Sequence, residues 1–151
     1  MNLILKLGVP ILLLFAAGCA SESNIVVRGV RFESERLSHG QQLYTQYCAS
    51  CHGANGEGQF PNAPNQPDAT GRIGAPPHNG TGHTWHHGDE LLVRYVYEGG
   101  MGDPENFYPM PAFGDQLAED DILAVIAYLK TMWNDEQRAN QQRVTEAEAS
   151  G

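Results

Sequence analysis

The sequence predicts an all-α domain in which three main helices are joined by long loops. Segments 34–51, 89–100 and 119–133 carry apolar residues at helical spacing. Between the first two, residues 53–88 are rich in Gly, Pro and Asn and almost lack aliphatic side chains. A loop of that length inside a compact domain needs something other than a side-chain core to organise it. We therefore expect the helices and loops to wrap around a bound group.

The first 18 residues do not belong to this domain. Lys6 precedes an apolar run that is too short to span a bilayer, and small residues lead to Cys19. The pattern resembles a bacterial lipoprotein signal, which implies that Cys19 is acylated and becomes the new N-terminus. Ala16 stands where that family usually has Leu, so the alternative is an ordinary secretory signal cut near Ala20. Both interpretations predict export.

Lipidation would tether the exported chain to a membrane surface without a transmembrane helix. Ala20, following the cysteine, favours the outer membrane in a bacterium with two membranes, by the sorting pattern of such lipoproteins. The whole chain has a formal charge of −9, and loss of Lys6 makes the exported chain more negative by a single charge. This charge disfavours nucleic acid and suits a partner with a positive docking face, although it also serves simple solubility.

The elements follow in order along the chain. Residues 19–33 are interpreted as a spacer with a brief β-like run and no core element. In the first helix, residues 34–51, Ser38 is the expected N-cap. The second helix has acids in its first turn, and Gly99 is expected to end it.

The third helix, residues 119–133, is the strongest. Acidic residues begin it, Lys130 lies in its last turn, and four aliphatic residues form the expected buried stripe, namely Ile122, Val125, Ile126 and Leu129. It closes a domain over residues 34–133. Residues 134–151 are polar, and we expect a mobile tail or a frayed helical extension.

The chemistry of the domain is indicated by the stretch CASCH. Cys48, Cys51 and His52 form the Cys-x-x-Cys-His pattern of covalent c-type haem attachment. Two thiols at this spacing reach the two vinyl groups of one porphyrin, and the adjacent imidazole coordinates the iron. A zinc site would need a second ligand pair that two domain cysteines do not provide. We expect one covalent haem c, with its iron.

Residues 38–133 resemble a class I cytochrome c. The resemblance rests on Gly40, Tyr44 and Cys48, which repeat every four positions along one helix face. It implies that the glycine lets the C-terminal helix cross closely and that Tyr44 packs against Tyr128. The implied fold has three main helices with long loops wrapped around one haem.

The resemblance also implies the second iron ligand. The stretch YPMPAFG is similar to the family segment that carries it, which makes Met110 the candidate axial thioether opposite His52. Met101, Met132 and a histidine of the HTWHH stretch are the competing ligands. Met132 is disfavoured because the end of the last helix should lie away from the ligand loop.

Residues that support the iron ligands and the haem rim are also predicted. A ligating imidazole usually donates its other N–H to a carbonyl, and the resemblance assigns that carbonyl to Pro76 or Pro77. The alternative is that these prolines only stiffen the loop. Trp85, with His86 or His87, is the candidate hydrogen-bonding group at the haem rim. Plain loop structure and a second metal site are alternatives for this stretch, the metal ligands being His78, His83, His86, His87, Asp89 and Glu90.

The expected function is one-electron transfer within a bacterial envelope, in a respiratory or related chain. With His52 and Met110 on the iron, both axial positions are filled, so the protein is not expected to be an enzyme. If Met110 does not ligate, haem-based binding of a small ligand or peroxide chemistry is the alternative. The expected partners are redox proteins, and the chain is expected to be a monomer.

Overall fold

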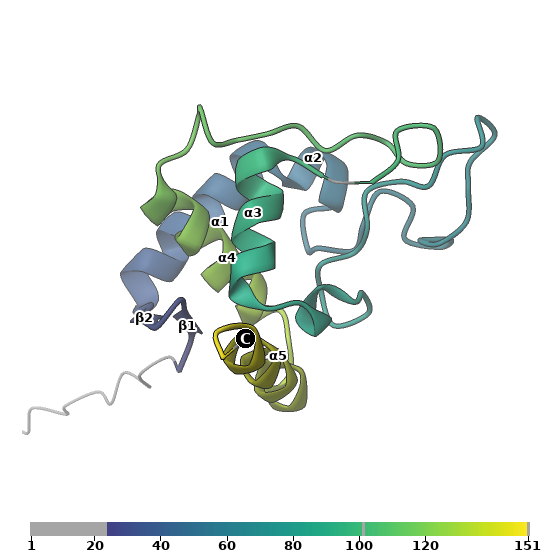
Figure 1. The fold of residues 1–151 in the computed structure, drawn as a ribbon. Coiled ribbons are helices and arrows are strands. Elements are labelled where there is room, and N and C mark those ends of the chain that lie inside the picture. Colours follow the sequence, from purple (N-terminus) through teal and green to yellow (C-terminus); the bar gives the residue numbers. More distant parts are fainter. Residues whose placement is uncertain (1–23, 101, 151) are drawn as a thin grey trace, which may run out of the picture.

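The structure is a computed structural model that describes residues 24–100 and 102–150. The predicted signal over residues 1–18, Cys19 and Met101 lie outside the described residues. The elements, drawn in Figure 1, are β1 (Val26–Val27), β2 (Val30–Arg31), α1 (Ser34–Tyr47), α2 (Ala49–His52), η1 (Thr84–His86), α3 (Asp89–Glu98), α4 (Glu119–Thr131) and α5 (Asp135–Glu148). This mainly helical architecture confirms the predicted class. No helix in the described part of the chain is long and apolar enough to cross a membrane.

The crossing of α1 and α4 forms the centre of the helical body. A Cβ atom placed on Gly40 would lie 2.1 Å from the carbonyl oxygen of Ala124, so only glycine allows the two backbones to approach this closely. One turn further along α1, the rings of Tyr44 and Tyr128 pack with centroids 5.4 Å apart and planes inclined by 54°. Both contacts are those predicted from the sequence.

The first helix differs from its prediction at both ends. It begins at Ser34, with Glu33 in the N-cap position, and the expected cap Ser38 lies inside the helix and donates its hydroxyl to the carbonyl of Ser34 at 2.9 Å. At the other end the helix is interrupted at Cys48, after which α2 forms a further turn. The buried stripe of α4 is as predicted, and Gly99 ends α3 with a φ of 92°.

The segment interpreted as a spacer contributes to the core, so that prediction is wrong for residues 24–33. Strands β1 and β2 pair as an antiparallel hairpin. The side chains of Ile25, Val27 and Phe32 are buried among those of the helices. These three residues remove apolar surface from water as α4 side chains do, which is why the hairpin is held against the body.

The C-terminal segment is also packed rather than mobile or frayed. Asn134 accepts a hydrogen bond from the Gln137 backbone N–H at 2.9 Å, and the Gln137 side chain accepts one from the Asn134 N–H, which forms a capping box that begins α5. Gln141 is 1% exposed despite its polarity. The helix is held by polar contacts with the body, and the low aliphatic content that suggested a tail did not reveal them.

A buried polar cluster joins these outer elements to the body. Asp89, at the start of α3, pairs with Lys130 of α4 at 2.7 Å, and the two side chains are 2% and 4% exposed. Asp89 also accepts hydrogen bonds from the Arg28 backbone N–H and the Gln141 side chain, both at 2.7 Å. Lys130 donates to the carbonyl of Val26 at 2.7 Å. We call Val26, Arg28, Asp89, Lys130 and Gln141 the polar hub.

Two long loops lie together at the other side of the molecule and extend away from the helices (Figure 1). Residues 59–75 and 102–109, which we call the loop lobe, meet at a parallel bridge between Ile73 and Phe107. The hydroxyl of Tyr108 donates to Asp68 at 2.7 Å across the same contact. Figure 1 places α2, with the haem motif, between the lobe and the helical body.

Candidate functional site

The CASCH motif begins at Cys48, which ends α1, and its other four residues form α2. The backbone N–H of His52 donates to the carbonyl of Cys48 at 2.9 Å, so the two residues lie one helical turn apart. Cys48 and Cys51 are both free thiols. Cys48 is partly buried, and burial raises the pKa of its thiol to about 11, whereas Cys51 is exposed. Both sulfur atoms are therefore available for thioether bonds on one short helical segment.

His52 is held in one orientation by the loop that follows it. Its side chain is buried, and its Nδ1 lies 2.9 Å from the carbonyl oxygen of Pro76. Because a carbonyl can only accept, Nδ1 donates and Nε2 keeps its lone pair. Burial lowers the pKa of His52, an effect opposed by the Pro76 carbonyl. Of the two prolines expected near His52, Pro76 makes this contact, while Pro77 is buried beside it.

The segment that carries Met110 is fixed against the end of α3. The Gly100 N–H donates to the carbonyl of Met110 at 3.1 Å, and a Cβ atom on Gly99 would lie 2.8 Å from the same oxygen. Further along, Phe113 donates its N–H to the carbonyl of Val96 at 3.0 Å. The Met110 side chain is partly buried against the apolar core.

The haem motif and the Met110 segment meet through aromatic side chains. Tyr47, next to Cys48, packs edge-on against Phe113, with ring centroids 6.1 Å apart. Leu92 and Val96 of α3 belong to the same apolar cluster. The structure thus brings together the two segments that the sequence predicted to face one haem.

The competing methionines occupy different places. A Cβ atom on Gly56 would lie 2.7 Å from the sulfur of Met132, so Met132 packs against the loop that follows His52. It therefore lies by the His52 loop and not in the segment against α3 that carries Met110. Met101 is outside the described residues.

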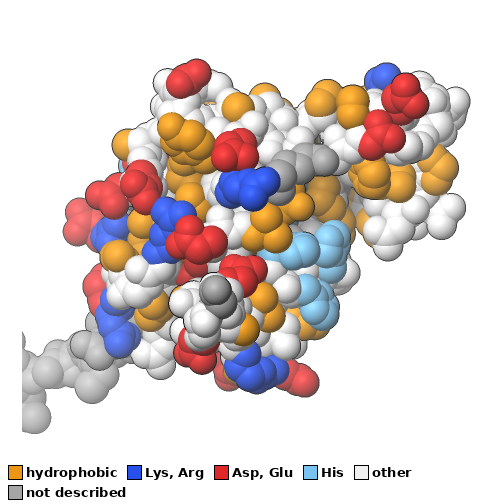
Figure 2. All heavy atoms as spheres, viewed as in Figure 1, with side chains coloured by type: hydrophobic (Ala, Val, Ile, Leu, Met, Phe, Trp, Pro, Cys, Tyr) orange, Lys and Arg blue, Asp and Glu red, His pale blue; other side chains and the backbone are white. Residues whose placement is uncertain are grey.

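The HTWHH stretch turns most of its rings toward the surface. His83 and His86 are exposed, and Figure 2 shows histidine side chains gathered on this face of the molecule. Trp85 stacks on His86 with centroids 3.7 Å apart and donates its Nε1–H to the carbonyl of Gly82 at 2.9 Å. His87 lies 5.3 Å from His83, centroid to centroid.

These contacts argue against both roles expected for the HTWHH stretch, which were hydrogen bonding at the haem rim and a second metal site. The indole N–H of Trp85 is already used within the loop. Two of the expected metal ligands are also engaged elsewhere, Asp89 with Lys130 and Glu90 with Arg28. Within residues 24–100 and 102–150, no group of three or more His, Cys, Asp or Glu side chains is arranged to hold a metal ion.

Two residues to which sequence reasoning gave no role beside His52 make contacts next to it. His78, considered only as one ligand of a second metal, stacks on His52 with ring centroids 4.0 Å apart. Thr84 is buried and its hydroxyl lies 2.8 Å from Nδ1 of His78. The contact joins two stretches of a loop without periodicity, so no sequence pattern could have identified it.

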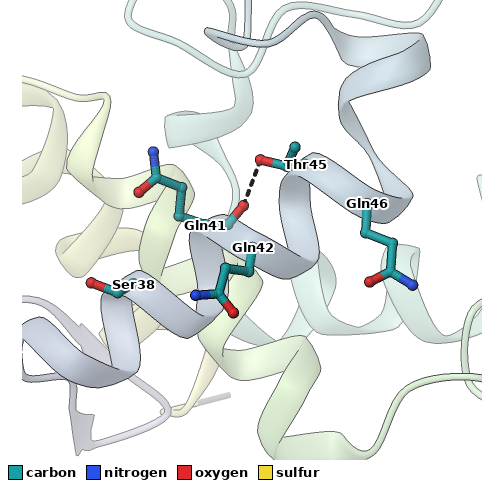
Figure 3. Close-up of a pocket in the computed structure, with 5 residues that line it drawn as sticks. All are labelled: Ser38, Gln41, Gln42, Thr45 and Gln46. Carbon is teal, nitrogen blue, oxygen red and sulfur yellow. Dashed lines mark hydrogen bonds between the residues drawn. The ribbon is translucent and has the colours of Figure 1, made fainter.

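A hollow in the described part of the surface lies apart from the haem motif and the Met110 segment. Figure 3 shows it on α1, with a volume of about 390 Å³, lined by Ser38, Gln41, Gln42, Thr45 and Gln46. Its side chains are neutral, and the Thr45 hydroxyl donates to the carbonyl of Gln41 within the helix. We therefore assign it no chemical role.

The residues present fit a covalently bound haem. The two thiols and a neutral imidazole occupy one helical segment, a thioether side chain lies in a fixed loop, and apolar side chains join the two. A helical domain with this donor set defines a c-type cytochrome.

Comparison with known proteins supports this assignment to the c-type cytochromes. Residues 37–133 match the Cytochrome c family, and the chain belongs to that family. It therefore binds covalent haem c with iron.

Two solved structures are similar to the chain. Cytochrome CL from the marine methylotrophic bacterium Methylophaga aminisulfidivorans MPT has 19% sequence identity and a TM-score of 0.51, over 76% of this chain and 65% of that one. Cytochrome cL from Hyphomicrobium denitrificans has 21% identity and a TM-score of 0.45, over 76% of this chain and 68% of that one. The chain thus spans slightly less than two thirds of the first structure, and the likeness to that first structure shows the fold.

Proposed function

We propose that the protein carries single electrons with His52 and Met110 as the axial ligands of its haem iron. The observation that carries the proposal is the hydrogen bond of 2.9 Å between Nδ1 of His52 and the carbonyl of Pro76, beside the two thiols. It leaves Nε2 as the only free nitrogen of a buried ring. Met110, held against Gly99 and Gly100, supplies the thioether from a separate segment.

The residues have separate tasks in this proposal. When bound, haem c supplies an iron that cycles between Fe(II) and Fe(III). His52 keeps one tautomer because Pro76 holds its proton, and the backbone contacts of Met110 keep its side chain in place. Fixed ligands change little between the two oxidation states. A thioether is a poorer donor to Fe(III) than an imidazole, so this pair favours a higher reduction potential than two histidines would.

The same ligation argues against an enzymatic role. If His52 and Met110 both bind the iron, a substrate would reach it only by displacing one of the two side chains. We propose that the protein has no substrate of its own and exchanges electrons with redox proteins. Acidic side chains are spread over the visible face of the helical body (Figure 2) and the chain has a net charge of −9, which favours a partner with a positive docking face.

We propose a location on the periplasmic side of the cell envelope. The support is the sequence of residues 1–18 and the small residues before Cys19. Acylation of Cys19 would anchor the protein to a membrane, with the outer membrane favoured by Ala20. Mass spectrometry of the intact exported protein tests this step, because diacylglycerol and acyl groups on Cys19 add a mass that conventional cleavage near Ala20 does not.

Replacement of Met110 tests the axial ligation. The ferric protein should show the weak far-red band of methionine-to-iron charge transfer. We expect Met110→Leu to abolish that band and lower the reduction potential, since a thioether ligand is lost. The matched controls are Met132→Leu and Met101→Leu, both of which should keep the band.

The outcomes of this experiment separate the alternatives. Retention of the band in Met110→Leu, with its loss in Met101→Leu, would assign the ligand to Met101 and contradict the proposal. A wild-type protein with no such band and rapid binding of carbon monoxide would favour the small-ligand or peroxide function. Neither outcome would alter the family assignment.

A further inference from the structure

We propose that His78 and Thr84 form a positioning pair that fixes the plane of the His52 imidazole. The proposal rests on the proposed role of His52 as an iron ligand. It assigns a function to the one buried residue of the HTWHH stretch, which is the threonine and not a histidine.

His78 is held at four points. Its N–H donates to the carbonyl of Gly56 at 2.7 Å, and its own carbonyl accepts the indole N–H of Trp133 at 2.8 Å. Its ring stacks on His52 at 4.0 Å with an angle of 27° between the planes. Its Nδ1 lies 2.8 Å from the Thr84 hydroxyl. A ring held at both its backbone and its side chain can serve as a fixed surface for its neighbour.

The Thr84 hydroxyl contacts both the His78 ring and the Pro77 backbone. The Thr84 oxygen lies 2.8 Å from Nδ1 of His78 and 3.4 Å from the carbonyl of Pro77. A carbonyl cannot donate, so the contact with Pro77 uses the Thr84 proton. The direction of the shorter contact is set by the tautomer of His78: Nδ1 donates to Thr84 when it carries the ring proton and accepts from Thr84 when Nε2 carries it. The hydroxyl therefore links the stacked ring to the backbone beside Pro76.

That backbone is the one that holds His52. Pro77 directly follows Pro76, whose carbonyl accepts the proton of His52. A Cβ atom on Gly82 would lie 2.0 Å from the carbonyl oxygen of Pro77, so the segment that leads into η1 packs directly against Pro77. His52 is thus restrained at its edge by Pro76 and on its face by His78, and Thr84 contacts His78 and Pro77, the residue that follows Pro76.

The orientation of an axial imidazole has a spectroscopic consequence. Rotation of the ring about the iron–nitrogen bond changes which iron d orbital overlaps with its π system. The principal g values of the ferric protein and the NMR shifts of the haem methyl groups report that rotation. Partners that orient a metal-bound histidine commonly affect the properties of the metal.

The experiment compares Thr84→Val and His78→Leu with wild-type holoprotein by electron paramagnetic resonance and by NMR of the ferric haem methyl groups. Thr84→Val keeps the volume and removes the hydroxyl, and His78→Leu removes the stacked ring. We expect both to shift the g values and the methyl resonances while the far-red band is kept. Thr84→Ser should restore the wild-type spectrum because the hydroxyl returns.

The matched control is Thr45→Val on the exposed face of α1 (Figure 3), where the hydroxyl also bonds a backbone carbonyl. It should leave both spectra unchanged. If Thr84→Val does not accumulate as holoprotein, His78→Phe and His78→Leu decide the matter, since the first keeps a stacked ring and should lie nearer the wild type.

Unchanged g values and methyl shifts in both Thr84→Val and His78→Leu would overturn the proposal, even if stability fell, because that outcome describes loop packing alone. Equal shifts in Thr45→Val would overturn it as well. Failure of the proposed ligation is recognised separately, in the wild type, as the absence of the far-red methionine band or of a low-spin ferric signal from covalently bound haem.

Discussion

The helical body and the loop lobe are held together by different forces. In the body, apolar side chains and the Gly40 crossing remove surface from water. In residues 59–75 and 102–109, no side chain is fully buried, and the contacts are hydrogen bonds such as those of Asp68 and Tyr108. An exposed hydrogen bond replaces one made to water, so its net contribution is small. The difference indicates that the body fixes stability and the lobe only adds to it.

The largest loss of stability is expected from a substitution at Gly40, in the helical body. In Gly40→Val the new side chain would overlap the backbone of Ala124, where a Cβ atom already lies 2.1 Å from the oxygen. We expect α1 and α4 to separate and the free energy of unfolding to fall by about 4 kcal/mol, at the upper end for overpacked cores. Guanidinium unfolding of the holoprotein followed by circular dichroism measures it.

The control for this change is Gln41→Val, one residue further along α1 on its exposed face (Figure 3). A surface substitution of this kind should change stability by less than about 0.5 kcal/mol. Equal losses in the two variants would mean that the helix tolerates no branched residue, and that the close crossing is not the cause.

A smaller effect is expected at the polar hub. Asp89→Asn removes the carboxylate that pairs with Lys130 and leaves a charged amine buried. Burial lowers the pKa of Lys130 while Asp89 opposes that shift. We expect a loss of about 3 kcal/mol, as when one partner of a buried pair is removed. Thermal or denaturant unfolding measures the loss.

Glu90→Gln is the matched control, because Glu90 is the next residue and its side chain is 63% exposed where it pairs with Arg28. It should lose less than about 1 kcal/mol. If Asp89→Asn is as mild as Glu90→Gln, the hub is solvated in solution and the burial argument fails.

The smallest and most local effect concerns Asp68 in the loop lobe. Hydrogen bonds from the side chain of Thr70 first, and then from Tyr108, lower the pKa of this carboxyl from its ordinary 3.8 to about 2. A lowered folded pKa means that the contribution of Asp68 is complete above pH 3.8 and is lost as pH falls toward about 2. We expect amide protection at the Ile73–Phe107 bridge to fall in that window.

Hydrogen-exchange protection factors of Ile73 and Tyr108, measured between about pH 4 and about pH 2 and compared with those of α4, check this expectation. Asp68→Asn should show low protection throughout and no additional loss as the pH falls. Equal pH dependence in the wild type and in Asp68→Asn would assign the effect to other carboxyl groups.

The sequence predicted the helical body better than the hairpin and α5, which pack against it. The spacing of Gly40, Tyr44 and Cys48 identified the face of α1 that contacts α4, because helix geometry converts spacing into position. Gly99 was expected as the end of α3, and its φ of 92° is one that glycine readily adopts. Helical periodicity and the backbone preference of glycine depend only on neighbouring residues, so both can be recognised in the sequence without knowledge of the fold.

The elements that were missed depend on contacts between distant residues. The hairpin has strands of two residues, too short for a clear alternation, although Arg28 and Gly29 both have positive φ and form its turn. The pattern Asn134-x-x-Gln137 is a capping box that was present in the sequence and overlooked. The burial of Gln141 could not have been predicted, because its partner Asp89 belongs to another helix.

The polar hub also determines how much of the chain unfolds as one cooperative unit. The family match covers residues 37–133, yet Lys130 bonds Val26 across 104 positions of sequence, and Gln141 bonds Asp89 across 52. Detaching either the hairpin or α5 would leave a buried charge with fewer partners, which raises the cost of partial opening. A fragment trimmed to the homologous region would therefore lack some of the structure that makes its unfolding a single transition.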